Sequence, residues 1–311
     1  MRALTVHSVP AAPAVTETPV PRPDAGELLV RVQASSVNGF DAATAAGYVQ
    51  GMMEHRFPLV LGKDFAGTVE AVGEGVTEFA AGDPVFGVVA KPFLGAGSLA
   101  EYVVVPAGSG VARIPDGVSV TDAGALGLAG AAALDSLAAV EPAEGETVLI
   151  AGATGGVGAI AVQYAAARGA RVIATALPGA QADFVRSLGA NVHVVDYTGD
   201  LAAQVKDFAP SGVDVALHLA GDGQAVAELV RAGGRVASTL GFGPDAVAGR
   251  DLTVVPVMAD ANAATLERLA ADVAAGRLRV PVTTTYPLEQ APQAFADFGA
   301  GSLGKLGITC A

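Results

Sequence analysis

The chain has 311 residues, 51% of them hydrophobic, and a net charge of −13 at pH 7. This length and composition allow one large or two ordinary domains with a substantial core. The acidic residues are spread along the chain, which argues against a nucleic-acid or anionic-membrane partner and favours small-molecule ligands.

The N-terminal segment lacks the pattern of a targeting signal. Residues 1–7 alternate in polarity like a strand and have no continuous apolar core. The longest weakly polar stretch, residues 124–133, is much shorter than the ~20 residues that cross a bilayer. We therefore expect no transmembrane helix and a cytoplasmic location. The single cysteine, Cys310, excludes an internal disulfide, and no neighbour in the sequence would activate it.

Residues 1–118 are predicted to form an all-β, barrel-like domain. Short alternating runs are separated there by turns rich in Gly and Pro. The predicted strands are 27–32, 68–72, 84–86 and 101–105. Two loops, 47–58 and 91–97, have no pattern that fixes their conformation.

After residue 119, β-rich runs alternate with Ala-rich stretches of about 10 to 15 residues, which is typical of βαβ units around a parallel sheet. The predicted strands are 147–151, 171–175, 192–195, 213–219, 235–240 and 253–257. Six such strands suit a doubly wound sheet. The tail, 283–311, is strand-like again and is expected to return to the first domain. The fold class is therefore α/β, with domains at 1–118 plus 283–311 and at 119–282.

A glycine-rich loop follows the strand at 147–151. Gly152, Gly155 and Gly158 recur at three-residue intervals, and residues 159–168 then predict a helix. Glycines allow the backbone to turn tightly and to approach a pyrophosphate, which the N–H groups at the helix start can bind. The order strand, loop, helix, strand therefore predicts a dinucleotide site. The candidate contacts are Ala153, Thr154, Gly155, Gly156, Val157 and Gly158.

A purely structural glycine turn is the alternative, because the pattern is GxxGxxG rather than GxGxxG. The end of the next strand bears on the choice of cofactor, since an acid there would bind the ribose of NAD and repel a 2′-phosphate. No acid occurs between Thr175 and Asp183, which favours NADPH. The alternative is a strand end without selectivity, because no Arg or Lys occurs nearby before Arg186.

Four further segments carry long motifs in a fixed order. They are residues 38–41, 61–73, 82–87 and 101–104. Together they resemble the medium-chain dehydrogenase/reductase superfamily, specifically its quinone oxidoreductase (zeta-crystallin-like) branch, over essentially the whole chain. The resemblance implies a GroES-like β-barrel catalytic domain closed by the C-terminal strands, a Rossmann domain, and an active site in the cleft between them. It also implies a homodimer, with the strand 253–257 near the sheet edge because Pro256 suits an edge.

Zinc-containing members of the superfamily carry a cysteine in the segment corresponding to residues 37–41. They also have a His-Glu pair where this chain has Lys63 and Asp64. Those ligands are missing, so we expect no metal site and a zinc-independent enzyme. Quinones and α,β-unsaturated carbonyls suit such an enzyme, because hydride addition gives a delocalised anion that a few hydrogen-bond donors can stabilise.

The resemblance implies two catalytic residues. Asn38 matches a position beside the nicotinamide, where it would act as an orienting donor, and Tyr48 matches a tyrosine that would donate to the substrate oxygen. The alternatives are a turn residue for Asn38 and a surface aromatic for Tyr48. Asp41 is expected to cap the following helix. Lys63 either faces the substrate or pairs locally with Asp64.

Further cofactor contacts follow from the same resemblance. Thr175 lies at the strand end, and Tyr197 corresponds to a tyrosine near the adenosine 2′-phosphate. The segment after the strand 235–240 is expected to meet the nicotinamide. It comprises Leu240, Gly241 and Phe242. Phe242 either forms a wall of the substrate pocket or packs in the core, and His218 is expected to be a buried, hydrogen-bonded strand residue.

The leading hypothesis is an NADPH-dependent, zinc-independent reductase that transfers hydride to a quinone or to the β-carbon of an enone, with Tyr48 or solvent as proton source. One alternative is an enoyl or ketone reductase of a biosynthetic pathway. Another is a regulatory NADPH-binding protein, because family contacts near Gln181, Ala132 and 298–302 are missing.

Overall fold

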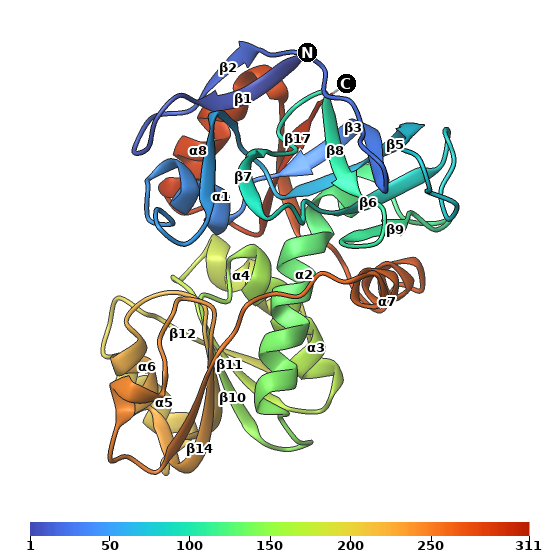
Figure 1. Ribbon diagram of the computed structural model, residues 1–311. Helices are drawn as coiled ribbons and strands as arrows, with labels where there is room; N and C mark the ends of the chain where they lie inside the picture. Colours follow the sequence, from blue (N-terminus) through green and yellow to red (C-terminus); the bar gives the residue numbers. More distant parts are fainter. Residues whose placement is uncertain (311) are drawn as a thin grey trace. The chain divides into compact units, whose positions relative to one another are not determined.

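The computed structural model describes residues 1–310, which form two compact units (Figure 1). Unit 1 comprises Met1–Ala129 together with the segment from Ala261 to the end of the chain, and unit 2 comprises Gly130–Asp260. The division lies about ten residues after the predicted first boundary and about twenty before the second. Helix α7 (Ala263–Ala274) accounts for most of the second difference, because it packs against strand β9 (Val111–Arg113) of unit 1.

Unit 1 is built on two sheets. One has the strand order β2-β1-β4-β7, and the other β16-β17-β3-β5-β6-β9, with β8 paired to β3. Its remaining strands are β1 (Arg2–Val6), β2 (Ala14–Glu17), β3 (Glu27–Ser36), β4 (Glu54–Val60), β5 (Asp64–Val72), β6 (Pro84–Val88), β7 (Phe93–Ala96), β8 (Tyr102–Pro106), β16 (Val282–Pro287) and β17 (Lys305–Thr309). Its remaining helices are α1 (Gly39–Ala45), η2 (Leu288–Gln290) and α8 (Ala291–Gly299).

The C-terminal tail completes unit 1, as the sequence predicts. Strand β17 pairs antiparallel with β3, so that Gly307 lies opposite Ser36. The apolar side chains of both sheets form one core, which includes Leu4, Val30, Phe65, Val105 and Ile308. The buried run of β17 begins with one charged residue, Lys305, which is 3% exposed.

Parts of the two loops without a predicted conformation are strands. β4 occupies the second half of the loop 47–58, and β7 lies in the loop 91–97. The two strands pair in parallel, with His55 opposite Leu94. Local propensity disfavours β4, because it contains charged residues and Pro58. Its conformation is therefore set by tertiary pairing rather than by its own sequence.

Unit 2 is a parallel sheet of order β12-β11-β10-β13-β14-β15, which is the doubly wound order. The strands are β10 (Thr147–Ala151), β11 (Arg171–Thr175), β12 (Val192–Val195), β13 (Val213–His218), β14 (Val230–Ser238) and β15 (Leu252–Pro256). The helices are α3 (Gly156–Ala167), α4 (Ala180–Arg186), α5 (Leu201–Phe208), α6 (Gly223–Glu228) and η1 (Pro244–Val247). All of β10 is buried, as expected for a strand covered on both faces, and β15 with Pro256 lies at the predicted edge.

Helix α2 (Val120–Val140) contains the weakly polar stretch 124–133 and extends beyond it at both ends, through Asp135. By length and composition it could cross a membrane, but 78% of its most apolar window is buried inside the protein. That burial is typical of the core helix of a folded domain, since an apolar helix must cover its surface against other elements.

Candidate active site

The glycine loop of unit 2 joins β10 to α3, and its three spaced glycines have different roles. Gly152 ends the strand with φ of 92°, a left-handed conformation that favours glycine. A Cβ at Gly158 would lie 2.1 Å from the Gly152 carbonyl oxygen, so only glycine lets α3 pack this close to the loop. Gly155 is the N-cap of α3 and has no side chain to bond the first helical N–H groups.

These features fit a pyrophosphate. The uncapped start of α3 presents backbone donors, and the helix dipole favours negative charge there. The loop lies between β10 and β13, where the strand order reverses, and dinucleotides bind at this point of a doubly wound sheet. Gly169 follows α3 with φ of 78°, a left-handed conformation that is common for glycine after the C-terminus of a helix.

Thr175 holds the glycine loop from the neighbouring strand. Its Oγ1 accepts a hydrogen bond from the Gly152 N–H at 2.9 Å and lies 3.4 Å from the Ile150 carbonyl oxygen. The side chain is 5% exposed. Thr175 therefore supports the shape of the cradle, and its direct contact with the cofactor stays a prediction.

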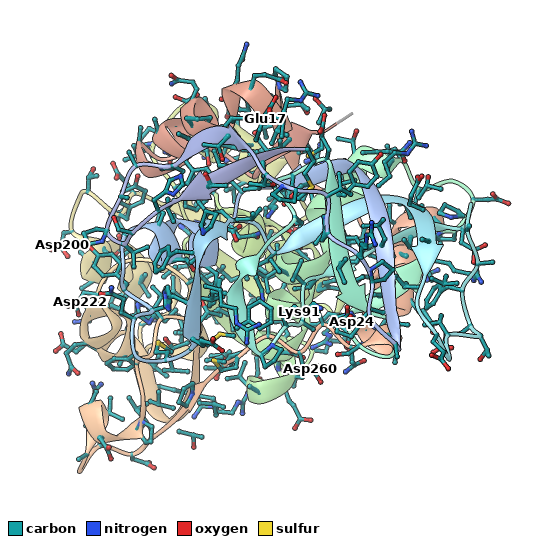
Figure 2. The ribbon with its side chains drawn as sticks, turned by 45° about the horizontal axis from the view of Figure 1, so that its top comes forward. Glu17, Asp24, Lys91, Asp200, Asp222 and Asp260 are labelled. Carbon is teal, nitrogen blue, oxygen red and sulfur yellow. The ribbon has the colours of Figure 1, made fainter. Side chains whose placement is uncertain are left out.

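The other cofactor candidates lie after the carboxyl ends of strands in the same sheet. Tyr197 follows β12 and is 48% exposed, and Leu240 follows β14 and is 54% exposed. Phe242 is half-buried, with its ring edge-on to His218 at 5.8 Å between centroids. His218 is buried and its Nδ1 lies 2.9 Å from Ser238 Oγ, as expected for a structural histidine. Two exposed acids here cap short helices: Asp200 begins α5 and Asp222 begins α6 (Figure 2).

Unit 1 contains a buried polar cluster around Asp64, which is fully buried on β5. Its Oδ2 accepts hydrogen bonds from Ser36 Oγ at 2.7 Å and from Asn38 Nδ2 at 2.9 Å, and lies 3.3 Å from Lys305 Nζ. Its Oδ1 accepts from the Leu128 N–H at 2.7 Å. The aspartate carries a full set of partners, and the ion pair crosses from β5 to β17.

Asn38 belongs to this cluster. Its Oδ1 accepts from Lys305 Nζ at 2.5 Å, and its Nδ2 donates to Asp64 and, at 3.5 Å, to the Ser36 carbonyl. The amide is 7% exposed, so its donors are directed into the protein. In these contacts Asn38 positions the buried ion pair, and its role as a donor to the nicotinamide stays a prediction.

Asp41 and Tyr48 lie at opposite ends of the α1 segment. Asp41 Oδ2 accepts from the Asn38 N–H at 3.0 Å, which confirms the predicted capping role, although the helix begins at Gly39. Burial, together with the negative charge of Asp64, raises the pKa of Asp41 to about 7. Tyr48 is 82% exposed, the position of a surface aromatic.

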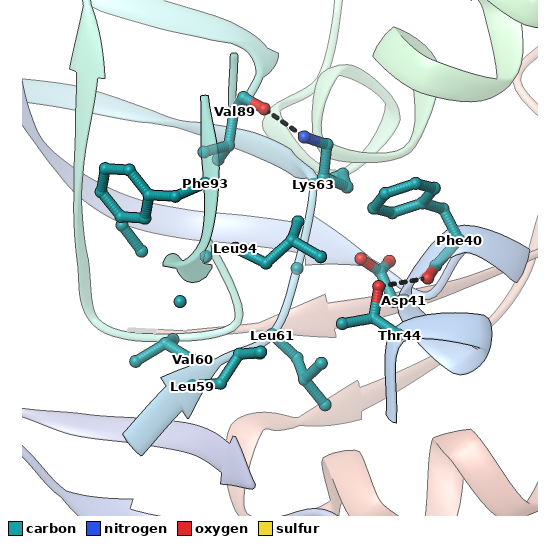
Figure 3. A pocket seen from close by; sticks show the side chains of 14 residues that line it. Phe40, Asp41, Thr44, Leu59, Val60, Leu61, Lys63, Val89, Phe93 and Leu94 are labelled. Atoms are coloured by element: carbon teal, nitrogen blue, oxygen red, sulfur yellow. Dashed lines mark hydrogen bonds between the residues drawn. The ribbon is translucent and has the colours of Figure 1, made fainter. Parts of the chain in front are cut away.

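A small pocket opens beside Asp41 in unit 1 (Figure 3), with a volume of about 20 Å³. It is lined by parts of α1, the end of β4, the residues before β5, and β7. Most of the lining residues are apolar, and Lys63 and Asp41 are its ionisable residues. A pocket of this size has room for about one water molecule or for one polar atom of a ligand.

A second cavity of unit 1 lies between the segment 18–24 and the sheet, with Asp24 and Lys91 among its lining residues (Figure 2). The Lys91 ammonium donates to the Glu27 carboxylate. Burial raises the pKa of Glu27, but the hydrogen bonds from Lys91 and from the Asp24 N–H lower it by more, so the pKa lies below its ordinary value. Two of its charged groups, Lys91 and Glu27, are thus paired with each other.

A catalytic zinc ion takes three protein ligands from His, Cys, Asp or Glu. Among residues 1–310, no group of three or more such side chains is placed to hold a metal ion. The positions that correspond to the His-Glu pair of zinc-containing members carry Lys63 and Asp64. Lys63 cannot ligate a metal as an ammonium, and the oxygens of Asp64 are engaged by hydrogen-bond donors. The residues present therefore do not fit a zinc ion.

Comparison with known proteins agrees with this architecture. Residues 24–116 match the alcohol dehydrogenase GroES-like domain, and residues 188–306 match the family model described as zinc-binding dehydrogenase. The chloroplast envelope quinone oxidoreductase homolog of Arabidopsis thaliana is 33% identical over 90% of this chain and 88% of its own length. The chain belongs to the medium-chain dehydrogenase/reductase superfamily, in its quinone oxidoreductase branch. It is therefore an oxidoreductase.

Two further relatives bear on the chemistry. The NADPH complex of mycobacterial Rv1454c superimposes with a TM-score of 0.85, at 28% identity over 99% of this chain and 100% of that one. A mycocerosic acid synthase-like polyketide synthase of Mycobacterium tuberculosis is 36% identical over 91% of this chain, which spans 14% of that protein. Both the free-standing and the synthase-embedded forms of this fold are thus similar to the chain.

No pattern in the sequence predicts the contribution of Lys305 to the buried cluster. The ion pair joins residues 241 positions apart, and no local pattern links them. One signal was present, since Lys305 starts a strand whose next three residues are buried. A lysine at such a position needs a buried partner, because an unpaired charge is rarely buried.

Proposed function

We propose that the protein is an NADPH-dependent reductase of quinones or α,β-unsaturated carbonyls that works without zinc, acts as a homodimer, and is located in the cytoplasm. The observation that carries the proposal is the glycine cradle at the switch point of unit 2, where Gly158 allows α3 to present its uncapped N–H groups. Ala153, Thr154, Gly155, Gly156 and Val157 would surround the pyrophosphate.

NADPH rather than NADH is supported by the end of β11. The strand ends at Thr175, and the first acid after it, Asp183, pairs with Arg186 on the exposed face of α4. No carboxylate is thus supplied to a ribose 2′-hydroxyl at the strand end. Tyr197 is exposed near this edge and would contact the adenosine, while Leu240, Gly241 and Phe242 would contact the nicotinamide.

The bound nicotinamide would supply the hydride. The residues of this chain would bind the substrate carbonyl, keep it from water and deliver the proton that follows. Conjugated acceptors suit the cavity of unit 1, because the anion formed from them is delocalised and the cavity offers few charged groups. Tyr48, exposed beside α1, is the donor that the family resemblance proposes.

An enoyl reductase of a biosynthetic pathway is the second candidate, favoured by the similarity to the polyketide synthase. The test is oxidation of NADPH and of NADH, in buffer with chelator, against a simple quinone and a simple enone. Saturable turnover with NADPH supports the proposal, and the product separates conjugate addition from ketone reduction. Tight NADPH binding without turnover of either acceptor would instead favour a regulatory nucleotide-binding protein.

A further inference from the structure

The pocket beside Asp41 in unit 1 contains an ammonium group, that of Lys63, which has no carboxylate partner. Lys63 is half-buried, and its Nζ donates to the Val89 carbonyl oxygen at 2.5 Å and lies 5.4 Å from the centre of the Phe40 ring (Figure 3). Among residues 1–310 it forms no ion pair. An ammonium has three donors, so two of them remain for a molecule in the cavity.

The adjacent aspartate, Asp64, forms its ion pair with Lys305 and not with this lysine. Both oxygens of Asp64 are taken by Ser36, Asn38, Lys305 and the Leu128 N–H. The negative charge of Asp64 is thus compensated from β17, on the far side of the buried cluster. Lys63 and Asp64 are neighbours in sequence with separate roles.

Asp41 completes the polar lining from α1. The side chain is 2% exposed and lines the cavity, and its Oδ2 is held by the Asn38 N–H. Its Oδ1 has no hydrogen-bond partner among residues 1–310. A carboxyl that is almost wholly buried, with one oxygen uncommitted beside a cavity, is suited to bind or exchange a proton there.

We propose that Lys63 binds and protonates the oxygen of the substrate in this cavity, and that Asp41 returns the proton to Lys63. This inference rests on the proposed reductase function and replaces Tyr48 by Lys63 as the proton donor. The pocket has room for the substrate oxygen, and the apolar residues around it, which include Leu59, Leu61, Phe93 and Leu94, would lie beside the adjoining hydrocarbon.

With an enone as substrate, the bound nicotinamide would supply hydride to the β-carbon, and the π electrons of the C=C bond would move through the conjugated system to the carbonyl oxygen. An N–H bond of the Lys63 ammonium then breaks as the O–H bond of the enol forms. The enol tautomerises to the saturated ketone when its α-carbon gains a proton from water and its oxygen returns one to water. The resulting amine takes a proton from the Asp41 carboxyl or from water, so that no further reductant or oxidant is needed.

The electrostatics of the cavity agree with this assignment. Burial lowers the pKa of Lys63, and the negative charges of Asp41 on α1 and Asp64 on β5 oppose that shift. Burial and the negative charge of Asp64 raise the pKa of Asp41. The positive charges of Lys305 on β17 and of Lys63 reduce that rise. A more acidic ammonium is a better proton donor near neutral pH.

The experiment compares wild type, Lys63→Met, Lys63→Arg and Tyr48→Phe as full-length proteins. Methionine keeps the length and the apolar stem of lysine, and arginine keeps the charge. The readouts are kcat for NADPH-dependent enone reduction from pH 6 to 9, NADPH affinity by fluorescence, and the affinity for 4-nitrophenolate followed by its absorbance. The phenolate carries a full negative charge on oxygen and requires no turnover.

We expect Lys63→Met to lower kcat by about 10²- to 10⁴-fold and to weaken phenolate binding at least about tenfold, a loss typical of an interaction with a charged group. NADPH affinity should stay within about twofold, because the cradle lies in unit 2. Lys63→Arg should retain most phenolate binding, and Tyr48→Phe should keep most of kcat. In wild type, kcat should fall at alkaline pH as the Lys63 ammonium loses its proton. Absence of that fall in Lys63→Met would support the same assignment.

Equal phenolate affinity in wild type and Lys63→Met would overturn the proposal, whether or not the variant turns over. If Lys63→Met misfolds, unchanged phenolate affinity in Lys63→Arg with intact NADPH binding supports a charge-based site, and a complete loss contradicts it. A wild type that binds phenolate through Lys63 but reduces neither acceptor would support the oxyanion site while contradicting the reductase function.

Discussion

At the residue scale, the function depends on positions where one atom decides the geometry. Gly158 admits no Cβ because the Gly152 carbonyl would lie 2.1 Å away, whereas a Cβ at Gly155 would lie 3.6 Å from the same oxygen, an ordinary contact. The two glycines are three residues apart in one loop and look alike in the sequence. The structure therefore separates a required glycine from a permissive one.

Gly158→Ala is expected to lose at least about tenfold in NADPH affinity and to destabilise the protein by about 1–3 kcal/mol, because the start of α3 must move away from the loop. Gly155→Ala is the matched control and should cost less than about 1 kcal/mol, since φ of −78° at this position is accessible to alanine. Fluorescence titration and urea unfolding measure the two effects. Equal losses in both variants would contradict the separate roles.

Asp41 makes a second residue-scale prediction, which concerns pH. Its folded pKa of about 7 lies above the ordinary value of 3.8, so the folded protein keeps a proton that the unfolded chain has released. Unfolding then releases a proton, and stability falls as pH rises from about 4 to about 7. The sign is opposite to that of a carboxylate stabilised by a salt bridge.

Asp41→Asn should remove this dependence while keeping an oxygen to cap α1. Between pH 5 and pH 8, the free energy of unfolding of wild type relative to Asp41→Asn is expected to fall by about 2–3 kcal/mol. Urea unfolding of both proteins at each pH measures this, and titrations common to the two proteins cancel in the difference. A difference that does not change with pH would show that Asp41 ionises normally.

At the element scale, three strands from distant parts of the chain share one charge pair. Strand β17 places Lys305 next to β3, and β5 brings Asp64 to the same point, with Asn38 bridging them after β3. Ser36 and the Leu128 N–H satisfy the remaining sites of the carboxylate. A pair this deeply buried gains little net energy when intact but is costly to break.

Lys305→Met is therefore expected to lower the free energy of unfolding by about 3–5 kcal/mol, since it leaves Asp64 charged and buried without its cation. The double variant Asp64→Asn with Lys305→Met should lose less than the sum of the single variants, because the charge and its partner are removed together. Lys206→Met, on the exposed face of α5, is the control and should stay within about 0.5 kcal/mol. Additive losses would indicate that the pair is not coupled.

The elements of unit 2 could be predicted because each signal is local. Strand β10 is a short apolar run before glycines, and the predicted limits of β11 and β12 coincide with the observed ones. Strand β14 begins at Val230, five residues early, because its first residues pair with β13 through a register shift across Gly233 and Gly234. Strands β4 and β7 could not be predicted, since each is held by the other.

At the scale of the whole molecule, the order of the units along the chain could be predicted, and the chemistry of unit 1 only in part. The return of the tail was expected from its strand-like composition, and its structural reason is the pairing of β17 with β3. Which polar residues meet there depends on contacts between residues more than 200 positions apart, such as Asp64 and Lys305. Neither spacing nor periodicity contains that information, so the contacts of Asn38 with the buried pair could not be predicted from the sequence.

Cofactor binding should appear as a change in the stability of the whole protein. A ligand that binds only the folded state at about 100 times its Kd adds about 2.7 kcal/mol, which corresponds to a rise of several degrees in Tm for a protein of this size. We expect NADPH to give this rise in scanning calorimetry and NADH, at the same concentration, to give a smaller one, because no acid follows β11 for the ribose of NADH.

Gly158→Ala should abolish the rise, and Lys63→Met should keep it, because Lys63 lies in unit 1 and outside the cradle. An equal rise with both nucleotides would mean that the end of β11 does not select between them, and no rise with either would contradict the dinucleotide site.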